Sequence, residues 1–562
     1  MTFTYKYTTK YTIFSWFRGI ISGMKTIKTV CLPLAIAILA FAFSGCSMGN
    51  EMSLGTVTFS FDRAGRAALY DPATISKLSL TVKVAGGSFH EKTDIREGDT
   101  VTFQVATGDC EVMAYAHLNG NLMAVGFEKI KVKPGPNGTF YIHMREPDEF
   151  SDGTAARPFF VYNETTLRRV GTETVGWSLG AHYRQIDNIT LNPENHWTPI
   201  GLETIPFTGV YDGGEYAISR LSVGGGRYQG LFGGMRGGAI KNVRLVDVGI
   251  NGDSFVGGVV GYNLNGKVEN CQVKGDIYGS GNYVGGVVGY NLNGTVENCH
   301  ITGAVFGEDH VGGVVGISSG SNGKVIACGF SMDVMSEVGV RGNNENTGGV
   351  VGNNSGGIVQ RCYSNGNVDG KEAVGGIAGV NSGGAKVQNC YAAGDVCGSA
   401  SGVGGVVGSN KDAGSAVEYC YATGDIEGYD RVGGVVGYND DDATVKNCVA
   451  LSLNITINVS GATFYIARIT ENSSASLSNN YGRLDAQLYR DATIPVIMYG
   501  TDVTGIDGGN ITSSQYYGGE SWWKDSSGVW SDPWSVYNWL LKEGQLPALQ
   551  NLPGQSTVYV RD

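Results

Sequence analysis

A single pattern of apolar residues and glycines recurs along the middle of the chain. Eight segments contain a version of Val-Gly-Gly-Val-Val-Gly, and seven of them are followed by Val-x-x-Cys. Successive copies are 27 to 29 residues apart, except for one step of 36 residues. The copies open at Tyr228, Val256, Val284, Val311, Thr347, Val374, Val403 and Val432. One short unit is therefore stacked on itself, because a unit this small can bury its apolar face only against neighbours.

The residues of one copy predict short strands joined at sharp corners. Val256, Val259 and Val260 form one predicted strand, and the glycines between them allow close backbone approach. Further strands are expected from Val268 to Ile277. At about 3.3 Å per residue, a unit of this length spans the perimeter of one β-helix coil. We therefore predict an all-β chain with a right-handed parallel β-helix, since the leucine-rich and propeller consensus patterns are missing.

The repeat also predicts which side chains point inward. Seven cysteines occupy the same position: Cys271, Cys299, Cys328, Cys362, Cys390, Cys420 and Cys448. An odd number of equivalent cysteines favours a stacked, buried column over disulfide pairs. Asparagine precedes four of them, where it is expected to pass amide hydrogen bonds along the stack. The step of 36 residues predicts an inserted loop within Met332 to Asn346.

These repeats resemble the GLUG motif. The resemblance rests on Gly230-Leu231-Phe232-Gly233, on Gly258-Val259-Val260-Gly261 and on the later copies, and it covers about residues 153 to 480. The motif is found in bacterial surface proteins and in accessory regions of some immunoglobulin A-cleaving metallopeptidases. It implies an exported, surface-displayed β-solenoid and no catalytic residues, because the motif itself is structural.

The regions before and after the repeats have different sequence patterns. Residues 47–147 contain short alternating apolar runs separated by turn signals, which predicts a small antiparallel β-sandwich, immunoglobulin-like or prealbumin-like. Residues 148–227 are predicted to form the N-terminal cap and entry coils, with a strand near Phe159 and a short helix from Glu164 to Val170. Residues 228–480 form the repeats. Residues 481–562 are predicted to be degenerate coils and an aromatic cap whose tryptophans fill its core.

The first 46 residues carry the pattern of an export signal. Lys25 and Lys28 precede an apolar run of 14 residues, too short to span a bilayer, which takes about 20. The following Ser44-Gly45-Cys46 resembles a bacterial lipobox, so Cys46 is the predicted lipidation site and Met24 the expected start. We expect an exported protein anchored by lipid at the outer membrane or cell surface; plain secretion is the alternative.

Charge and composition exclude some classes of partner. The chain has 562 residues, 88 glycines, only 16% charged residues and a formal net charge of -12. An acidic surface of this kind repels nucleic acid, so DNA and RNA are excluded as partners.

No catalytic, cofactor or metal site is predicted. The nearest approach to a zinc-binding His-Glu-x-x-His motif is His90-Glu91, which lacks the second histidine. Asp276, Asp395 and Asp425 recur after a glycine, but corner positions explain them better than the paired carboxylates of a glycosidase. The acidic turn at Asn439 to Asp442 lacks calcium-loop spacing.

The leading hypothesis is a non-enzymatic, monomeric surface lipoprotein that binds a host, matrix or glycan ligand. Tyr262 and Tyr290 match in adjacent copies and suggest a sugar-stacking strip, with Tyr438 at the same repeat position. Two alternatives remain open: a polysaccharide lyase or glycosidase that uses one face of the β-helix, and a purely structural stalk or surface-layer component.

Overall fold

The computed structural model describes residues 54–62, 77–84, 89–92, 100–118, 121–143, 147–332, 339–440, 442–458, 465–472, 476–496, 502–523, 534, 538–552 and 555. It divides into two compact units: residues up to 144 without 122–124, and residues 122–124 with 145 onward. None of the helices in these ranges is long and apolar enough to cross a membrane. Cys46 and the rest of the predicted export signal lie outside the described residues.

The N-terminal unit consists of two small sheets, ordered β4-β1-β7 and β3-β2-β5-β6. Its strands are β1 (Leu54–Asp62), β2 (Lys77–Val84), β3 (Phe89–Lys92), β4 (Thr100–Ala106), β5 (Gly108–Leu118), β6 (Asn121–Val132) and β7 (Gly135–His143). Val57 and Phe59 of β1 are buried at alternate positions, whereas β5 is buried at every residue from Val112 to Ala116. The small antiparallel sheets are as predicted, except that β1 pairs with β7 in parallel.

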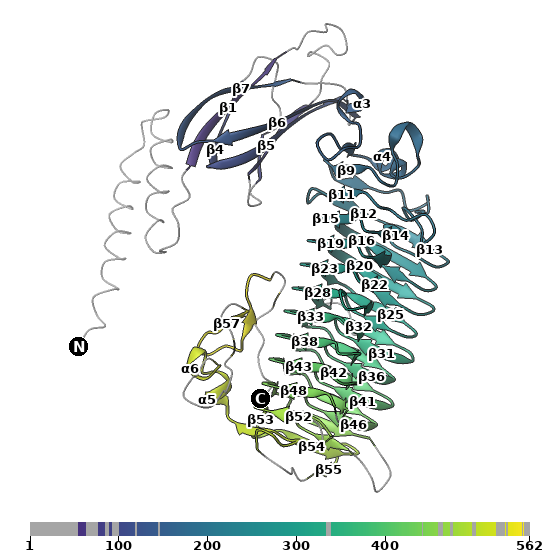
Figure 1. Ribbon diagram of the computed structural model, residues 1–562, viewed down its shortest axis with the longest axis vertical. Helices are drawn as coiled ribbons and strands as arrows, with labels where there is room; N and C mark the ends of the chain where they lie inside the picture. The colour runs from purple at the N-terminus through teal and green to yellow at the C-terminus, as the bar shows by residue number, and fades with distance from the viewer. Residues whose placement is uncertain are drawn as a thin grey trace, which may run out of the picture. The chain divides into compact units, whose positions relative to one another are not determined.

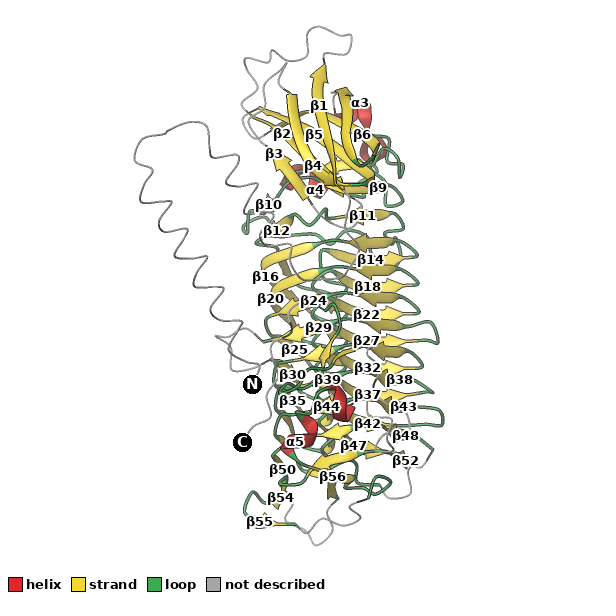
Figure 2. Cartoon of the chain, turned by 90° about the vertical axis from the view of Figure 1, so that its left-hand side faces the viewer, coloured by secondary structure: helices red, strands yellow, loops and turns green. Residues whose placement is uncertain are grey.

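The second unit is the predicted parallel β-solenoid, whose central coils pass in turn through four sheets, numbered 1 to 4 in chain order within a coil (Figures 1 and 2). Sheet 3 has 12 strands, which gives about 12 turns. Sheet 1 contains β17 (Val256–Gly257), β21 (Val284–Gly285), β26 (Val311–Gly312), β31 (Glu345–Gly348), β36 (Glu372–Gly375), β41 (Ser401–Gly404), β46 (Asp430–Gly433) and β51 (Ile466–Ala467). Sheet 2 contains β14 (Phe232–Arg236), β18 (Val260–Leu264), β22 (Val288–Leu292), β27 (Val315–Ser319), β32 (Val351–Ser355), β37 (Ala378–Ser382), β42 (Val407–Asn410) and β47 (Val436–Asn439).

The other two sheets complete each coil. Sheet 3 contains β8 (Phe159–Val161), β9 (His182–Gln185), β11 (Val210–Asp212), β15 (Ala239–Lys241), β19 (Lys267–Glu269), β23 (Thr295–Glu297), β28 (Lys324–Ile326), β33 (Ile358–Gln360), β38 (Lys386–Gln388), β43 (Ala416–Glu418), β48 (Thr444–Lys446) and β52 (Ser476–Ser478). Sheet 4 contains β10 (Ile189–Thr190), β12 (Ala217–Ser219), β13 (Ser222–Gly224), β16 (Arg244–Gly252), β20 (Gln272–Gly279), β24 (His300–Thr302), β25 (Val305–Gly307), β29 (Gly329–Ser331), β30 (Val340–Gly342), β34 (Tyr363–Ser364), β35 (Val368–Gly370), β39 (Tyr391–Ala392), β40 (Val396–Gly398), β44 (Tyr421–Ala422), β45 (Ile426–Gly428), β49 (Val449–Ala450), β50 (Asn454–Ile457), β53 (Tyr481–Arg483), β54 (Gln487–Arg490), β55 (Ile494–Pro495) and β56 (Gly509–Ile511).

The interior contains the predicted cysteine column. All seven cysteines of the column are buried and free. Burial raises the pKa of thiols such as Cys271 and Cys328, so they act as small buried hydrophobes. The motif glycines are required by the close stacking of the coils, because a Cβ added to Gly258 would lie 2.5 Å from the carbonyl oxygen of Gly286.

A second interior column was not predicted. Its six asparagines and one serine are fully buried at the turn between sheets 2 and 3: Asn263, Asn291, Ser318, Asn354, Asn381, Asn410 and Asn439. Asn263 donates from Nδ2 to Oδ1 of Asn291 at 2.8 Å, and Asn381 donates to Asn410 in the same way at 2.8 Å. Each amide also satisfies turn carbonyls, as Asn263 does at Gly266. This column, which we call the asparagine column, carries amide hydrogen bonds from coil to coil.

The asparagines before the cysteines pass amide hydrogen bonds along the stack, as expected, but only in part. They adopt left-handed backbone angles, for example φ 54° at Asn270, and so form the corner itself. Side-chain bonds along this row join Asn242 to Asn270 at 3.2 Å and Asn447 to Asn479 at 3.1 Å. In other coils alanine, arginine or tyrosine stands at this corner, so the row of amides is not continuous.

The two ends of the solenoid are closed differently. At the N-terminal end α4 (Glu164–Arg169) follows β8, close to the predicted strand and helix. Two shorter elements, α3 (Pro147–Phe150) and a 3₁₀ turn (Thr174–Gly176), flank them. At the other end Arg468 is fully buried where the repeat has its second glycine. Its guanidinium donates to the carbonyl oxygens of Gly482 and Gly508 at 3.1 Å each.

The described part of the C-terminal segment, residues 502–523, 534 and 538–552, differs from the predicted cap because it packs against the side of the solenoid (Figure 1). It contains α5 (Ser513–Tyr516), α6 (Glu520–Trp523), β57 (Trp539–Leu540) and β58 (Ala548–Leu549). Its tryptophans pack on a stack of three buried tyrosines that extend from sheet 4, Tyr363, Tyr391 and Tyr421. The Tyr421 hydroxyl donates to the Pro547 carbonyl oxygen at 2.6 Å.

The predicted insertion lies between β29 and β30, residues 332–339. In the preceding coil only two residues separate the equivalent strands β24 and β25. Residues 333–338 lie outside the described part of the chain.

Candidate ligand-binding edge

The loops that enter sheet 1 stack on one another and form one outer edge of the solenoid, which we call the sheet-1 edge. Backbone bonds hold the loops in register, such as Glu372 N to Asn344 O at 3.1 Å. In three successive coils the residue before the sheet-1 strand has a left-handed backbone: φ is 59° at Phe255, 66° at Tyr283 and 54° at His310. Side chains that are uncommon in this conformation are thus held in fixed positions along one line.

Four rings lie along the first part of the edge: the first and last pairs are stacked, whereas Phe255 and Tyr283 between them are tilted by 39°. The ring centroids of Tyr228 and Phe255 are 4.7 Å apart, those of Phe255 and Tyr283 4.8 Å, and those of Tyr283 and His310 5.2 Å. Each ring is therefore largely covered by its neighbours. A sugar could stack on a ring face only at an end of this row.

Of the three tyrosines singled out in the sequence, two join this row and the third lies apart. Tyr262 and Tyr290 are partners in adjacent sheet-2 strands, with ring centroids 5.4 Å apart. Tyr290 also lies 5.3 Å from Tyr283. Tyr438 has the same position several coils away, where the Arg431 guanidinium lies 4.6 Å over its ring. The first two can contact one ligand together, whereas Tyr438 would belong to another part of the surface.

Hydroxyl groups at this edge are partly shielded from water. Tyr228 donates to a carboxylate oxygen of Glu203 at 2.5 Å, and burial with this carboxylate raises the pKa of Tyr228 to about 12. Burial also raises the pKa of Tyr262. These phenols therefore stay protonated at neutral pH and act as hydrogen-bond donors.

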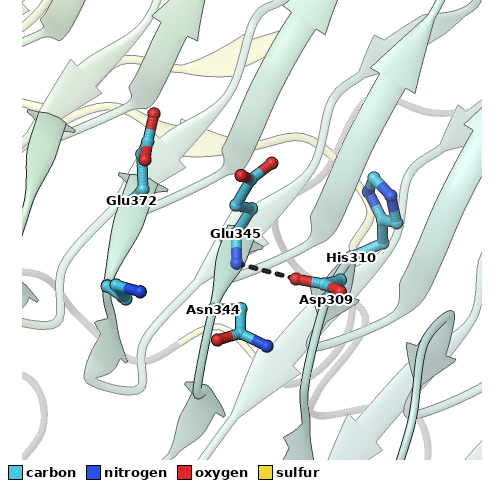
Figure 3. A pocket seen from close by; sticks show the side chains of 6 residues that line it. Asp309, His310, Asn344, Glu345 and Glu372 are labelled. Atoms are coloured by element: carbon cyan, nitrogen blue, oxygen red, sulfur yellow. Dashed lines mark hydrogen bonds between the residues drawn. The ribbon is translucent and has the colours of Figure 1, made fainter.

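A polar pocket of about 350 Å³ follows the aromatic row along the same edge (Figure 3). It spans three successive coils and is lined by Asp309, His310, Asn344, Glu345, Lys371 and Glu372. His310 belongs both to the pocket and to the ring stack, so the two features are continuous. Burial lowers the pKa of His310, which keeps the imidazole neutral at neutral pH.

Hydrogen bonds hold the lining groups in place. Oδ1 of Asp309 accepts from the backbone N–H of Glu345 at 3.0 Å. The Asn344 amide donates to Glu308 at 3.0 Å, and the Asn346 amide is 3.1 Å from Nδ1 of His310. Glu345 and Glu372 are register partners in β31 and β36. The pocket therefore presents carboxylates, an amide, an imidazole and an ammonium group, which together suit a ligand rich in hydroxyl or amino groups.

The pocket residues were not identified from the sequence, although Asn344 and Glu345 lie within the range given for the insertion. A usable signal was present: the residue two positions before the first valine or threonine of the motif is acidic in three successive copies, Asp309, Glu345 and Glu372. The recurring acids Asp276, Asp395 and Asp425 lie instead directly after a glycine.

Those glycine-linked aspartates have a structural role at the corner inside sheet 4. Oδ1 of Asp276 accepts from the backbone N–H of Ala304 at 2.9 Å, and Oδ1 of Asp395 accepts from that of Asp425 at 2.8 Å. They join coil to coil, as expected for corner residues. Asn439 belongs to the asparagine column. Within the described ranges, no group of three or more His, Cys, Asp or Glu side chains is arranged to hold a metal ion.

Comparison with known proteins supports the assignment of the repeats. The GLUG motif model matches residues 254–278, 280–305, 370–396, 399–427 and 428–456. None of the curated proteins searched matches this sequence. The crystal structure of a "putative immunoglobulin A1 protease from Bacteroides ovatus" aligns with 71% of this chain and 94% of its own, at 19% identity and a TM-score of 0.31, too low to carry an argument.

Most of the pocket lies where the motif is interrupted. Asp309, His310, Asn344 and Glu345 fall in the stretch between the second and third matched segments. With five matched copies in one continuous solenoid, the chain is a GLUG-repeat protein.

Proposed function

We propose that this protein is a lipid-anchored β-helix protein of the bacterial cell surface that binds a glycan at the sheet-1 edge without transforming it. GLUG repeats on a β-solenoid fit a surface protein. The observation that carries the proposal is the polar pocket beside the aromatic row, at the place where the repeat is interrupted. Regular repeat positions build the solenoid, so a binding site belongs among the residues that depart from the pattern.

The binding proposal is tested on the full chain with an array of neutral, acidic and amine-bearing glycans. We expect saturable binding to at least one of these classes. Replacing Tyr262 and Tyr290 by alanine should weaken it, because both rings adjoin the row that leads to the pocket. Tyr278→Ala is the matched control, since Tyr278 is an exposed tyrosine of sheet 4. Absence of saturable binding throughout the array would favour a purely structural stalk.

The anchor is tested separately. Cys46→Ala should abolish labelling by a radioactive fatty acid and move the protein from the membrane fraction to the soluble exported fraction. The same substitution at the exposed Cys397 should change neither result. Membrane retention of Cys46→Ala without label would contradict lipid anchoring at this residue.

One observation favours an enzymatic alternative. Glu345 and Glu372 are register partners in adjacent coils, about 4.8 Å apart along the solenoid. Paired carboxylates are the groups that glycosidases use as acid and nucleophile or base. Release of reducing ends or unsaturated sugars from a polysaccharide, lost in Glu345→Gln, would establish the alternative. Binding without turnover would exclude it for the glycans tested.

A further inference from the structure

The proposed glycan site has an uneven distribution of charge. Carboxylates of six residues lie along the aromatic row and the pocket: Glu203, Asp253, Glu308, Asp309, Glu345 and Glu372. The basic side chains along the same stretch are Arg227, Arg236 and Lys371, half the number of the carboxylates. His310 adds no positive charge, because burial keeps it neutral at neutral pH. The field at this edge is therefore negative, which attracts cations.

The rings of this edge already attract cations of the chain itself. The Arg227 guanidinium lies 5.5 Å from the ring centroid of Tyr228 and 4.9 Å from that of Phe255. Farther along the edge Arg431 lies 4.6 Å from the ring centroid of Tyr438. Cations over ring faces are favourable contacts. The chain thus already places its own cations on rings of this surface.

We infer that the ligand of the sheet-1 edge is a glycan with free, positively charged amino groups. The inference rests on the proposed function and adds the charge class of the ligand. Amino groups would meet the carboxylates of Glu345 and Glu372, while hydroxyl groups would bond to Asn344 and His310.

A glycan fits this surface better than a basic peptide does. The sheet-1 strands at the pocket are paired with the coils on both sides, so they offer no open edge on which an extended peptide could add a strand. The pocket lining is polar and offers no apolar anchor site for peptide side chains. Polar groups converging from three coils suit a ligand with many hydroxyl groups.

The test compares three soluble probes by titration with the full chain at low salt and mildly acidic pH. The probes are a glucosamine hexamer, the matching N-acetylglucosamine hexamer and hexalysine. We expect the glucosamine hexamer to bind at least about tenfold more tightly than the other two. The double variant Glu345→Gln with Glu372→Gln should lose about tenfold of that affinity. The control double variant Glu194→Gln with Glu215→Gln removes two exposed carboxylates elsewhere and should keep it.

Each contrary outcome has a distinct meaning. Equal binding of the acetylated hexamer overturns the charge inference but leaves glycan binding in place. Hexalysine binding as tightly as glucosamine overturns the glycan class. Loss of affinity in the control variant would show that overall charge, and not this edge, attracts the probe. If neither sugar binds and the wider array is also negative, the proposed function itself fails.

Discussion

Two columns of side chains run through the same coils and differ in how much the residue type can vary from coil to coil. The asparagine column is fully buried, and six of its seven members are asparagine, whose amide can donate to the next coil and also accept. The sheet-1 edge column is exposed to water and contains Ser254, Asn282, Asp309, Glu345, Glu372, Ser401 and Asp430. The same residue type is thus repeated where neighbouring coils bury the side chain. The residue type varies where water can hydrogen-bond to the side chain in place of a neighbouring coil.

A third column shows that repeat position alone does not decide this. Sheet 4 begins with Gln272 and His300 in earlier coils and with Tyr363, Tyr391 and Tyr421 in later ones. Gln272 is exposed, whereas all three tyrosines are fully buried under the C-terminal segment. What covers a side chain determines how much that side chain contributes to the free energy of unfolding. Four predictions test this rule, from the largest effect to the smallest.

The largest loss is expected at the covered tyrosines. Tyr421→Ala should lower the free energy of unfolding by about 3–5 kcal/mol, because it removes a fully buried ring and the bond to Pro547. Urea unfolding of the full chain measures the effect. Tyr278→Ala, at an exposed position of sheet 4, should change it by less than about 1 kcal/mol. Equal losses would mean that the C-terminal segment does not protect this side.

The next loss is expected within the asparagine column. Asn381→Leu should cost about 2–4 kcal/mol, because it leaves the oxygens of Asn410 and Ala385 without their donor. Thermal and urea unfolding give the value. Asn282→Ser in the edge column should stay within about 0.5 kcal/mol, since serine already occupies that position in other coils. A neutral Asn381→Leu would contradict the role given to the column.

A pH-dependent loss is expected at the boundary between the open and covered parts of sheet 4. His300 is hydrogen-bonded to the Tyr363 hydroxyl at 2.9 Å, and burial lowers the pKa of His300 to about 4. Below an unfolded pKa of about 6.5 the unfolded chain binds the proton first, so stability falls as pH drops from about 6.5 to about 4. The loss reaches up to about 3 kcal/mol.

Unfolding measured across this range in the protein and in His300→Gln isolates the contribution. Glutamine occupies the equivalent position at residue 272, and the variant should lose that part of the pH dependence. Identical pH profiles would show that His300 is not responsible.

The smallest effect on stability is expected at the edge. Glu345→Gln and Glu372→Gln should each change the unfolding free energy by less than about 0.5 kcal/mol, because both side chains are exposed. A slight gain is the expected sign, since like charges in register repel. Calorimetry measures it beside the binding titrations. A large loss would place these carboxylates in the framework of the fold instead of its binding surface.

Sequence patterns predicted the inside of the solenoid far better than its outside. The cysteine column, the glycines of the motif and the position of the insertion followed from spacing, because each coil must repeat what its neighbours pack against. The asparagine column was missed because Ser318 and the inserted residues interrupt its regularity. The pocket was missed because its acids share a column that also contains serine and asparagine and so shows no constant residue type.

By itself, the sequence determined that the chain stacks as parallel coils and which side chains face inward. Buried positions require a similar side chain in every copy of the repeat, so they recur at a fixed spacing. Only the tertiary structure decided which outer residues meet. Tyr421 meets Pro547 across 126 residues, and the Arg361 guanidinium meets the Gln550 carbonyl oxygen across 189. No local spacing encodes such contacts, because outer positions are free of the packing constraint that makes the interior periodic.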